Sequence, residues 1–576
     1  MSGFKFDRSH LIGRVREVDT RKVMIVVGSD EDLRKARVGQ LAAMSLSGAA
    51  ESWLIGVIER VKKSVATPAV EKTDELTGKP DNDLGEQVVN SVRLTLLGTV
   101  RWKASAEKYE FSRSLTHVPD IDSECHALKD VHLEFFMNIL SVEGQKEHSL
   151  SLGTYTIDES ANAWLDGNKF FQRHAAILGS TGSGKSWTVA AILERAAKLP
   201  SANLVLFDLH GEYRKLSYAR HLRIPGPDET GAAVDELLYL PHWLLNAEEM
   251  QAMFIDRSEF SAHNQVMAFQ DAVVHEKKTV LTELGRDDVL KAFTLDSPVP
   301  FSIHNVIAKL KRLNEEMTQG ARGLKQGLFF GQFSRLLTRL SSKLTDKRYG
   351  FLFQAPDSRH SYDSMARLAE TLMDYSIKDS NIKVIDFSEV PSEILPVIVG
   401  LVARMIYNVQ FWTDHEKRRP IAFVCDEAHL YLPKKEGKNP VEKRAVDAFE
   451  KIAKEGRKYG VALLVISQRP SDVSPTILSQ CNNIIALRLS NADDQNTVRK
   501  MMPESLESLL DVLPIMDIGE ALVVGDAVLL PSRITITPPK EKPLGGTIDF
   551  WSKWMEETGQ PDFAKAVENM RRQSRG

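Results

Sequence analysis

The sequence predicts an α/β core built on a parallel sheet, with a β-rich segment before it and a helical bundle inserted between its two halves. Three observations support this fold class. Short apolar stretches separated by turn residues recur up to about residue 150, strands alternate with helical patterns from about residue 170, and residues 235–376 have mainly helical patterns. Alternating strands and helices are typical of a parallel sheet that helices cover on both faces.

The composition is that of an ordinary globular chain. Of the 576 residues, 43% are hydrophobic and 26% are charged, and the formal net charge of −4 does not favour a broad surface that coats nucleic acid. The sequence shows neither a run of eighteen apolar residues nor the apolar core of a signal peptide, so we expect no membrane span and a cytoplasmic location. Cys125, Cys425 and Cys481 lie far apart without metal-type spacing, and we expect them to be small buried hydrophobes.

Residues 1–150 are expected to form a small β-domain. The stretches LIGRVREVD, RKVMIVVG and SVRLTLLGTVRW have strand patterns, and short strands at regular spacing predict a barrel or a sandwich. Residues 67–86 are polar, contain Pro and Gly and lack periodicity, so an exposed loop is expected there.

The rest of the chain is expected to form the core, its insertion and a tail. Asn246 followed by Glu249 has the spacing of a capping box that opens a helix in the bundle. The stretch GEALVVGDAVLLPSRITITPP predicts a hairpin that closes the sheet, and the tail predicts one or two short helices with a basic end. The segments are a first core part, the helical bundle, a second core part and the tail: residues 151–234, 235–376, 377–540 and 541–576.

A phosphate-binding loop is predicted at residues 175–189, AAILGSTGSGKSWTV, which contain the complete pattern G-x-x-x-x-G-K-[ST] between an apolar strand and a helix. Glycines allow a tight loop whose backbone N–H groups face one anion, and the positive end of the helix dipole faces the same point. Lys185 is expected to reach the β- and γ-phosphates, and Ser186 to bind Mg²⁺ through its hydroxyl. A Gly/Ser-rich connection without a ligand is the alternative. The site predicted for ATP and Mg²⁺ comprises Ser180, Thr181, Gly182, Ser183, Gly184, Lys185, Ser186 and Trp187.

The second half of the site is expected at residues 421–430, IAFVCDEAHL, where an apolar strand ends in Asp426 and Glu427. Open parallel sheets bind ligands at the carboxyl ends of their strands. Asp426 is expected to meet the Mg²⁺ shell, and Glu427 to orient and deprotonate an attacking water, which favours hydrolysis over group transfer. A further strand, VALLVISQRP, ends at Gln468, a candidate sensor of the γ-phosphate and the water. Solvated strand ends without function are the alternative.

Extra positive charge on the transferring phosphoryl group is expected from an arginine of a neighbouring subunit. Arg457 in KEGRKYGVALL and Arg173 in FFQRHAAILG each lie just before a strand of the sheet. Both are candidates for action in trans, with an ordinary surface arginine as the alternative. The expected catalytic residues are Lys185, Glu427, Gln468, Arg457 and Arg173.

Five stretches between residues 170 and 531, and their order along the chain, are typical of one protein family. They are RHAAILGSTGSGKS, FDLHGEY, CDEAHLYLP, EGRKYGVALLVISQRPSDVSPTILSQCNNIIALRL and GEALVVGDAVLLP. They resemble the HerA family of hexameric DNA-translocating ATPases, and LIGRV near the N-terminus is similar to the start of that family's barrel. The resemblance implies a RecA-like P-loop NTPase core, a homohexamer with double-stranded DNA through its centre, and trans action of Arg457. It also implies a functional role for Arg173 and a position near the site for Asp208 and Glu212.

The resemblance also bears on partners. It implies a separately encoded effector protein, such as a nuclease or a sirtuin-like NAD-degrading enzyme, in antiphage defence or DNA end processing. A scaffold that binds nucleotide and regulates its partner with little translocation is a second hypothesis; a pump with a membrane tether is a third. Since six copies of a loop converge in a ring, modest basicity suffices for DNA binding. The candidate loop, PKKEGKNPVEKR, is otherwise a solvated charged loop; its basic residues are Lys434, Lys435, Lys438, Lys443 and Arg444.

Overall fold

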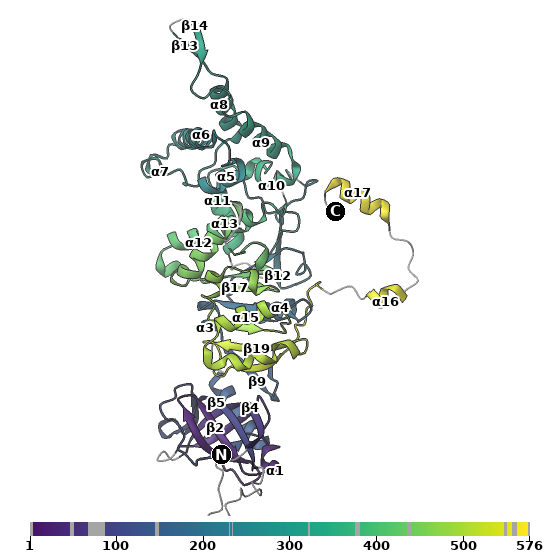
Figure 1. Cartoon of the computed structure of the whole chain (residues 1–576). Helices are drawn as coiled ribbons and strands as arrows, with labels where there is room; N and C mark the ends of the chain where they lie inside the picture. The colour runs from purple at the N-terminus through teal and green to yellow at the C-terminus, as the bar shows by residue number, and fades with distance from the viewer. Residues whose placement is uncertain are drawn as a thin grey trace, which may run out of the picture. The chain divides into compact units, whose positions relative to one another are not determined.

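The computed structural model forms two compact units, called here the barrel unit and the core unit (Figure 1). The barrel unit comprises Met1–Phe170, Leu178–Gly184 and Asn482–Pro538, and the core unit Phe171–Ile177, Lys185–Cys481 and Pro539–Gly576. The residues described are 4–46, 51–66, 87–144, 149–229, 231–232, 234–320, 323–374, 381–434, 440–545, 550–555 and 562–573.

In the described part of the barrel unit, six strands close into a barrel in the order β2-β1-β7-β3-β4-β5, because β2 also pairs with β5. Closure leaves no free sheet edge in the ring, and the interior is filled by apolar side chains such as Ile12, Val23 and Leu94, all buried. Of the two alternatives from sequence, the barrel is correct. The strands are β1 (Leu11–Asp19), β2 (Lys22–Val27), β3 (Leu41–Ser45), β4 (Ser52–Ala66), β5 (Gln87–Lys103) and β7 (Glu124–Ala127), with β6 (Lys108–Ser112) added on β5.

The barrel unit also contains an antiparallel run of strands, ordered β18-β19-β20-β8-β9. The pair β19 (Glu520–Gly525) and β20 (Ser532–Ile536) is the hairpin predicted from the sequence. The other pair of adjacent strands, and the helix before it, were not predicted from the sequence. Those elements are α2 (Asp130–Gly144), β8 (Ser149–Tyr155) and β9 (Asp158–Asp166), and the run begins with β18 (Asn483–Ala486).

The core unit is built on strands ordered β12-β15-β11-β16-β17-β10. The pairings that join β12, β15, β11, β16 and β17 are all parallel, and β11, β15, β16 and β17 are buried along their whole length, as expected for a sheet covered on both faces. Strand β17 lies between β16 and β10, which confirms the RecA-like α/β core. The bounds are β10 (Ala175–Leu178), β11 (Leu204–Asp208), β12 (Ala219–Arg223), β15 (Ile382–Asp386), β16 (Ile421–Cys425) and β17 (Val461–Ser467).

Helix α12 (Leu395–Trp412) packs against α13 (Pro440–Glu455). It is the one described helix that is long and apolar enough to cross a membrane, with a mean hydropathy of 1.3, yet 72% of it is buried inside the protein. Arg404, Asn408 and Gln410 interrupt its sequence, so α12 contains no continuous run of eighteen apolar residues. Gly400 permits the close helix contact, since a Cβ there would lie 2.9 Å from the Cα of Ala445. The burial of α12 is therefore that of a helix in a protein core.

The region between the two halves of the sheet is mainly helical, as predicted, but it also contains a small hairpin. The capping box is confirmed: Asn246 Oδ1 accepts the Glu249 N–H at 2.8 Å and Glu249 Oε2 accepts the Asn246 N–H at 2.8 Å. Arg404 of α12 donates two hydrogen bonds to the same Glu249 carboxylate, which ties this region to the core. The elements include α5 (Ala247–Phe254), α6 (Ala262–Glu283), α8 (Ile303–Glu315), β13 (Met317–Gly320), β14 (Gly323–Gln326), α9 (Ser334–Thr345) and α11 (Ser364–Met373).

Two short helices near the C-terminus, α16 (Phe550–Met555) and α17 (Phe563–Arg572), confirm the helical tail.

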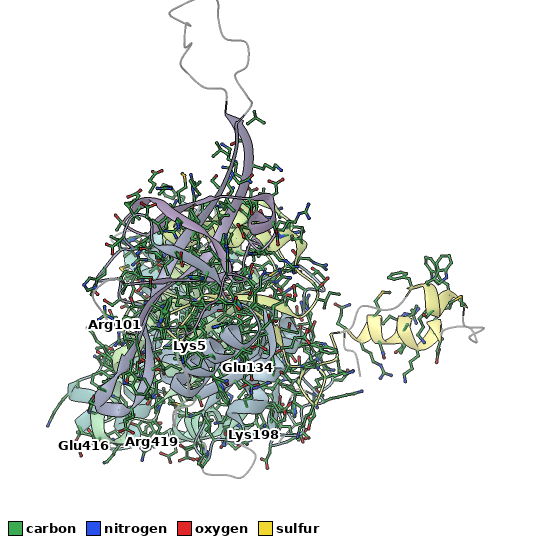
Figure 2. All side chains as sticks on the ribbon, turned by 90° about the horizontal axis from the view of Figure 1, so that it is seen from below. Lys5, Arg101, Glu134, Lys198, Glu416 and Arg419 are labelled. Carbon is green, nitrogen blue, oxygen red and sulfur yellow. The ribbon has the colours of Figure 1, made fainter. Side chains whose placement is uncertain are left out.

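The surface mixes charges of both signs, as Lys5, Arg101 and Glu134 illustrate on the barrel unit (Figure 2). The three cysteines are buried free thiols, as expected, and burial raises the pKa of Cys125 and Cys481 to about 12.

Candidate active site

The phosphate loop leaves β10 at Leu178 and has the closed shape that its sequence pattern predicts. Gly182 and Gly184 have φ angles of +75° and +105°, a region that favours glycine. The Ser183 N–H donates to the Ser180 carbonyl at 3.2 Å, and the Ser180 N–H donates to the Arg488 carbonyl at 2.8 Å. A Cβ on Gly179 would lie 2.5 Å from Ser183 Oγ, so a larger residue at this position would distort the loop.

Lys185 and Ser186 follow the loop and begin helix α4 (Lys185–Ala196). Burial lowers the pKa of Lys185, while the carboxylates of Glu427, Asp426 and Glu212 oppose this effect by favouring the charged amine. The Ser186 hydroxyl donates to Glu212 Oε2 at 2.9 Å. Five polar groups from three separate stretches of sequence therefore lie together at the start of α4. They are the Lys185 amine, the Ser186 hydroxyl and the carboxylates of Glu212, Asp426 and Glu427.

Asp208 shapes the loop that places Glu212. Its carboxylate accepts backbone N–H groups of four residues at 2.8–3.2 Å: His210, Gly211, Glu212 and Tyr213. Gly211 allows this tight turn with a φ of +72°. The family resemblance implied only that Asp208 lies near the nucleotide site. These hydrogen bonds indicate that it organises the loop at residues 210–213.

Asp426 follows β16 and is buried. The Tyr213 hydroxyl donates to Asp426 Oδ2 at 3.1 Å. Burial, followed by the nearby charges of Glu427 and Glu212, raises the pKa of Asp426 to about 7. A divalent cation would offset this repulsion among carboxylates.

Mg²⁺ fits the residues present. Hydroxyl and carboxylate oxygens, here those of Ser186 and Asp426, are the ligands that Mg²⁺ prefers, and it is commonly bound through one or two such groups together with substrate phosphates. In the part of the chain that the structure describes, no group of three or more His, Cys, Asp or Glu side chains could hold a metal ion by itself. Phosphate oxygens would therefore have to complete the shell.

Glu427 turns the chain immediately after Asp426. It is a non-glycine residue in the left-handed region, with φ 43° and ψ 44°, and its N–H donates to Asp426 Oδ1 at 2.9 Å. Strained backbone of this kind is concentrated at functional sites. Burial raises the pKa of Glu427, whereas the Lys185 charge and a hydrogen bond from the Gln468 backbone N–H lower it. The structure thus brings Glu427, Lys185 and Gln468 together, as expected from sequence.

Arg173 and Arg457 lie at the amino-terminal ends of strands of the core sheet. Gln468 lies at the opposite, carboxyl end of β17. Arg457 belongs to the 3₁₀ turn Gly456–Tyr459, which precedes β17, and Arg173 precedes β10. His174 links these strand starts, because its Nδ1 accepts the Leu463 N–H at 3.0 Å and its Nε2 pairs with the Ala453 carbonyl at 3.0 Å. The seven residues of β17 separate Arg457 from Gln468 by about 20 Å. The structure therefore does not bring the two arginines to the phosphate loop of their own chain.

The remaining candidates are on the surface or outside the described residues. Trp187, next to Ser186, is 39% exposed, and the Lys542 ammonium lies 5.1 Å from its ring centroid. In the candidate basic loop, Lys434 is exposed and Lys443 is exposed on α13. Lys435, Lys438 and the side chain of Arg444 lie outside the part of the chain that the structure describes.

Two residues that lie at the site, Tyr213 and His429, were not predicted from the sequence. Tyr213 contacts Asp426, and His429 Nδ1 lies 3.3 Å from Glu427 Oε2 and 3.5 Å from Ser467 Oγ. Both lie inside stretches singled out for their acidic residues, FDLHGEY and CDEAHLYLP. Their position within these stretches was the available signal.

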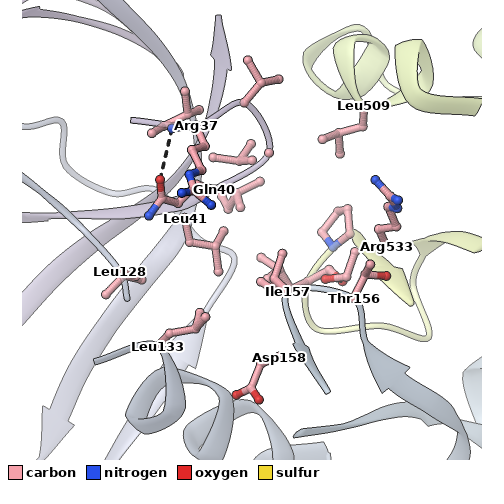
Figure 3. Close-up of a pocket in the computed structure, with 18 of the residues that line it drawn as sticks. Arg37, Gln40, Leu41, Leu128, Leu133, Thr156, Ile157, Asp158, Leu509 and Arg533 are labelled. Carbon is pink, nitrogen blue, oxygen red and sulfur yellow. Dashed lines mark hydrogen bonds between the residues drawn. The ribbon is translucent and has the colours of Figure 1, made fainter. Parts of the chain in front are cut away.

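A separate cavity of about 750 Å³ lies in the barrel unit (Figure 3). Leu41 and Leu128 line it from the barrel side, and Ile157, Leu509 and Arg533 line it from other parts of the unit. It contains no residue of the predicted nucleotide site.

Comparisons with known proteins agree with the sequence motifs. The family model described as Helicase HerA, central domain, matches residues 150–406, and the model described as Helicase HerA-like C-terminal matches residues 398–537. A DNA double-strand break repair helicase HerA of Saccharolobus solfataricus is 25% identical over 399 residues, which cover 69% of this chain and 70% of that protein. The protein of the same name from Pyrococcus furiosus is 26% identical over 428 residues, which cover 68% of this chain and 70% of that protein.

Among solved structures, VirB4 of Thermoanaerobacter pseudethanolicus has a TM-score of 0.43 at 18% identity, and the match covers 70% of this chain and 99% of that one. The plasmid coupling protein TrwB in complex with ADP and Mg²⁺ has a TM-score of 0.43 at 14% identity. The match covers 70% of this chain and 93% of that one. The two family models together span residues 150–537, from the strands before the phosphate loop to the end of the closing hairpin. The chain belongs to the HerA family.

Proposed function

We propose that this protein is an ATP-dependent DNA helicase or translocase that works as a cytoplasmic homohexamer on double-stranded DNA. One observation supports this function most strongly: Lys185, Ser186, Glu212, Asp426 and Glu427 cluster where α4 begins and β16 ends. This arrangement holds the parts needed for phosphoryl transfer to water, and HerA family membership connects it with DNA.

The roles follow from the positions. The phosphate loop and the Lys185 amine bind the triphosphate, with Lys185 on the β- and γ-phosphates. Ser186 and Asp426 would hold Mg²⁺, which would offset the negative charge of the phosphates. Glu427 orients the attacking water and accepts its proton, and Gln468, at the end of the neighbouring strand, contacts the γ-phosphate and this water.

The far-edge position of Arg457 and Arg173 supports an assembly in which each chain completes the site of a neighbour. An arginine supplied in this way raises the rate by about 10³–10⁵. A homohexameric ring with the duplex in its centre provides such neighbours, and the stretch PKKEGKNPVEKR is its proposed DNA contact. Relatives named DNA double-strand break repair helicase support DNA as the substrate. We assign DNA cutting or NAD degradation, in antiphage defence or end processing, to a separate effector protein.

The test compares the wild-type chain with Lys185→Ala and Glu427→Gln. The wild type should hydrolyse ATP faster when double-stranded DNA is added, and native mass spectrometry should show six copies. Lys185→Ala should lose ATP binding, whereas Glu427→Gln should keep it and lose about 10²–10⁴ in kcat. A triplex-displacement assay then separates two outcomes. Release of the third strand with ATP supports translocation; hydrolysis without release favours a scaffold that regulates its partner. A chain that binds no nucleotide contradicts both.

A further inference from the structure

A short segment after the closing hairpin, Pro539–Gly545, lies along the core unit and is called the strap here. Hydrogen bonds along its length fasten it. The Lys540 N–H donates to Glu194 Oε2 at 2.7 Å, the Ser217 N–H donates to Glu541 Oε2 at 2.6 Å, and the Leu544 N–H donates to the Glu212 carbonyl at 2.6 Å. Backbone and side-chain groups both take part, so the path of the strap is defined along its length.

The strap runs along α4 toward the phosphate loop. Trp187 and Glu194 are seven residues apart, two turns of helix, and therefore lie on the same face of α4. Lys540 is fixed at Glu194 and Lys542 lies over Trp187, so the strap proceeds from the C-terminal to the N-terminal end of the helix. It ends beside Glu212, where a Cβ on Gly545 would lie 2.2 Å from the carboxylate.

Trp187 is an unusual surface residue at this place. It follows Ser186 directly, and its indole is 39% exposed although most of α4 is buried. The Lys542 ammonium lies 5.1 Å from the ring centroid, within the range of a cation–π interaction. An exposed aromatic face and a cation from the strap thus lie together at the first turn of α4, directly after the phosphate loop.

We propose that Trp187 and the strap bind the nucleobase of the nucleoside triphosphate. The base stacks on the indole face, and Lys542 closes over it from the strap. This inference rests on the proposed function, because the triphosphate must occupy the loop at residues 179–186 for the base to reach Trp187.

The chemistry of this base site is tolerant of base identity. Every base has a π-face, so stacking on an aromatic ring discriminates weakly. The strap N–H groups of Lys540 and Leu544 already donate to Glu194 and to the Glu212 carbonyl, so they do not read the edge of a base. ATP and GTP should therefore bind with similar affinity.

The test measures binding by calorimetry to the full-length protein with Mg²⁺ and three probes: AMP-PNP, GMP-PNP and inorganic tripolyphosphate. Tripolyphosphate fills the phosphate loop and has no base. Trp187→Ala should weaken AMP-PNP and GMP-PNP about tenfold or more and leave tripolyphosphate within twofold, whereas Trp187→Phe should retain most of the affinity because a ring remains. Lys542→Ala should weaken both nucleotides about threefold.

Matched controls separate the base site from damage to the fold. Lys540→Ala changes an exposed lysine of the same strap, and Trp412→Ala removes a tryptophan that is 81% exposed elsewhere; both should bind all probes like the wild type. The inference is overturned if Trp187→Ala binds AMP-PNP normally, or if it weakens tripolyphosphate as much as AMP-PNP. Failure of the proposed function has a different result: the wild type binds none of the probes.

Discussion

The Ser186 hydroxyl donates a 2.9 Å hydrogen bond to the Glu212 carboxylate, and this bond joins the first turn of α4 to the loop that Asp208 organises. The same hydroxyl is the proposed Mg²⁺ ligand. Its oxygen could bind Mg²⁺ through a lone pair while its proton is still donated to Glu212, so the Glu212 carboxylate would lie beside the cation. Two residues 26 positions apart are thus coupled through one proton donor.

Glu212→Gln should weaken the binding of Mg²⁺. The substitution removes one negative charge next to the proposed cation, so half-maximal ATPase activity should need about tenfold more free Mg²⁺. ATPase rates measured against free Mg²⁺ at constant ATP test this. Glu283→Gln, at an exposed position on α6, should leave the curve unchanged. An unaltered Mg²⁺ requirement in Glu212→Gln would show that this carboxylate does not act on the ion.

His429 should act as a positioning residue for Glu427. Its Nδ1 lies 3.3 Å from Glu427 Oε2 and 3.5 Å from Ser467 Oγ, so it bridges the ends of β16 and β17. His429→Leu should lower kcat about tenfold with little change in KM, because the water-activating carboxylate loses a neighbour and nucleotide binding does not. His429→Asn, which keeps a donor, should recover part of the rate. A change in KM alone would contradict this role.

Arg457 should complete the site of a neighbouring chain. Arg457→Ala and Glu427→Gln should each be nearly inactive, with Arg457→Ala reduced about 10³-fold or more. Mixed assemblies of the two variants should regain activity, because Arg457→Ala chains keep Glu427 and can receive the arginine of a Glu427→Gln neighbour. Lys458→Ala, at the adjacent exposed position, serves as the control. Mixtures that stay inactive, or an active Arg457→Ala protein, would contradict trans action.

Lys277 should make stability depend on pH. This buried amine donates to the carbonyls of Leu295 and Ser297 at 2.9 and 2.8 Å, and burial lowers its pKa to about 8. Between pH 8 and 10.5 the unfolded chain holds a proton that the folded chain has released, so the free energy of unfolding rises with pH by up to about 3 kcal/mol. This gain should disappear in Lys277→Met.

Urea unfolding at pH 7.5 and pH 10 measures this difference. Lys278→Met, an exposed neighbour on α6, should keep the wild-type pH response. Equal responses of the wild type and Lys277→Met would show that the amine is already neutral, or still charged, across this interval.

Features determined by a few neighbouring residues were predictable from the sequence. The capping box at Asn246 and Glu249 depends on a spacing of three, and the phosphate-loop glycines depend on local φ angles. The joining of the phosphate loop to Asp426 and Glu427 was also predictable, because strand ends of a parallel sheet meet at one edge.

Features that depend on contacts between distant residues were not predictable in this way. The barrel was separated from a sandwich only by the β2–β5 pairing, which no local pattern encodes. Tyr213 and Asp426 are 213 positions apart, and the strap reaches α4 from 346 positions away. The hairpin β13–β14 was missed because four-residue strands inside helical surroundings have too short a pattern to detect.

The location of Arg173 and Arg457 has a consequence for regulation by concentration. Under the proposed function, a solitary chain holds the nucleotide but lacks the cation that accelerates its breakdown. Newly made subunits would then conserve ATP until enough copies associate, and turnover per chain should climb steeply with protein concentration. A small fraction of defective copies would silence intact ones beside them.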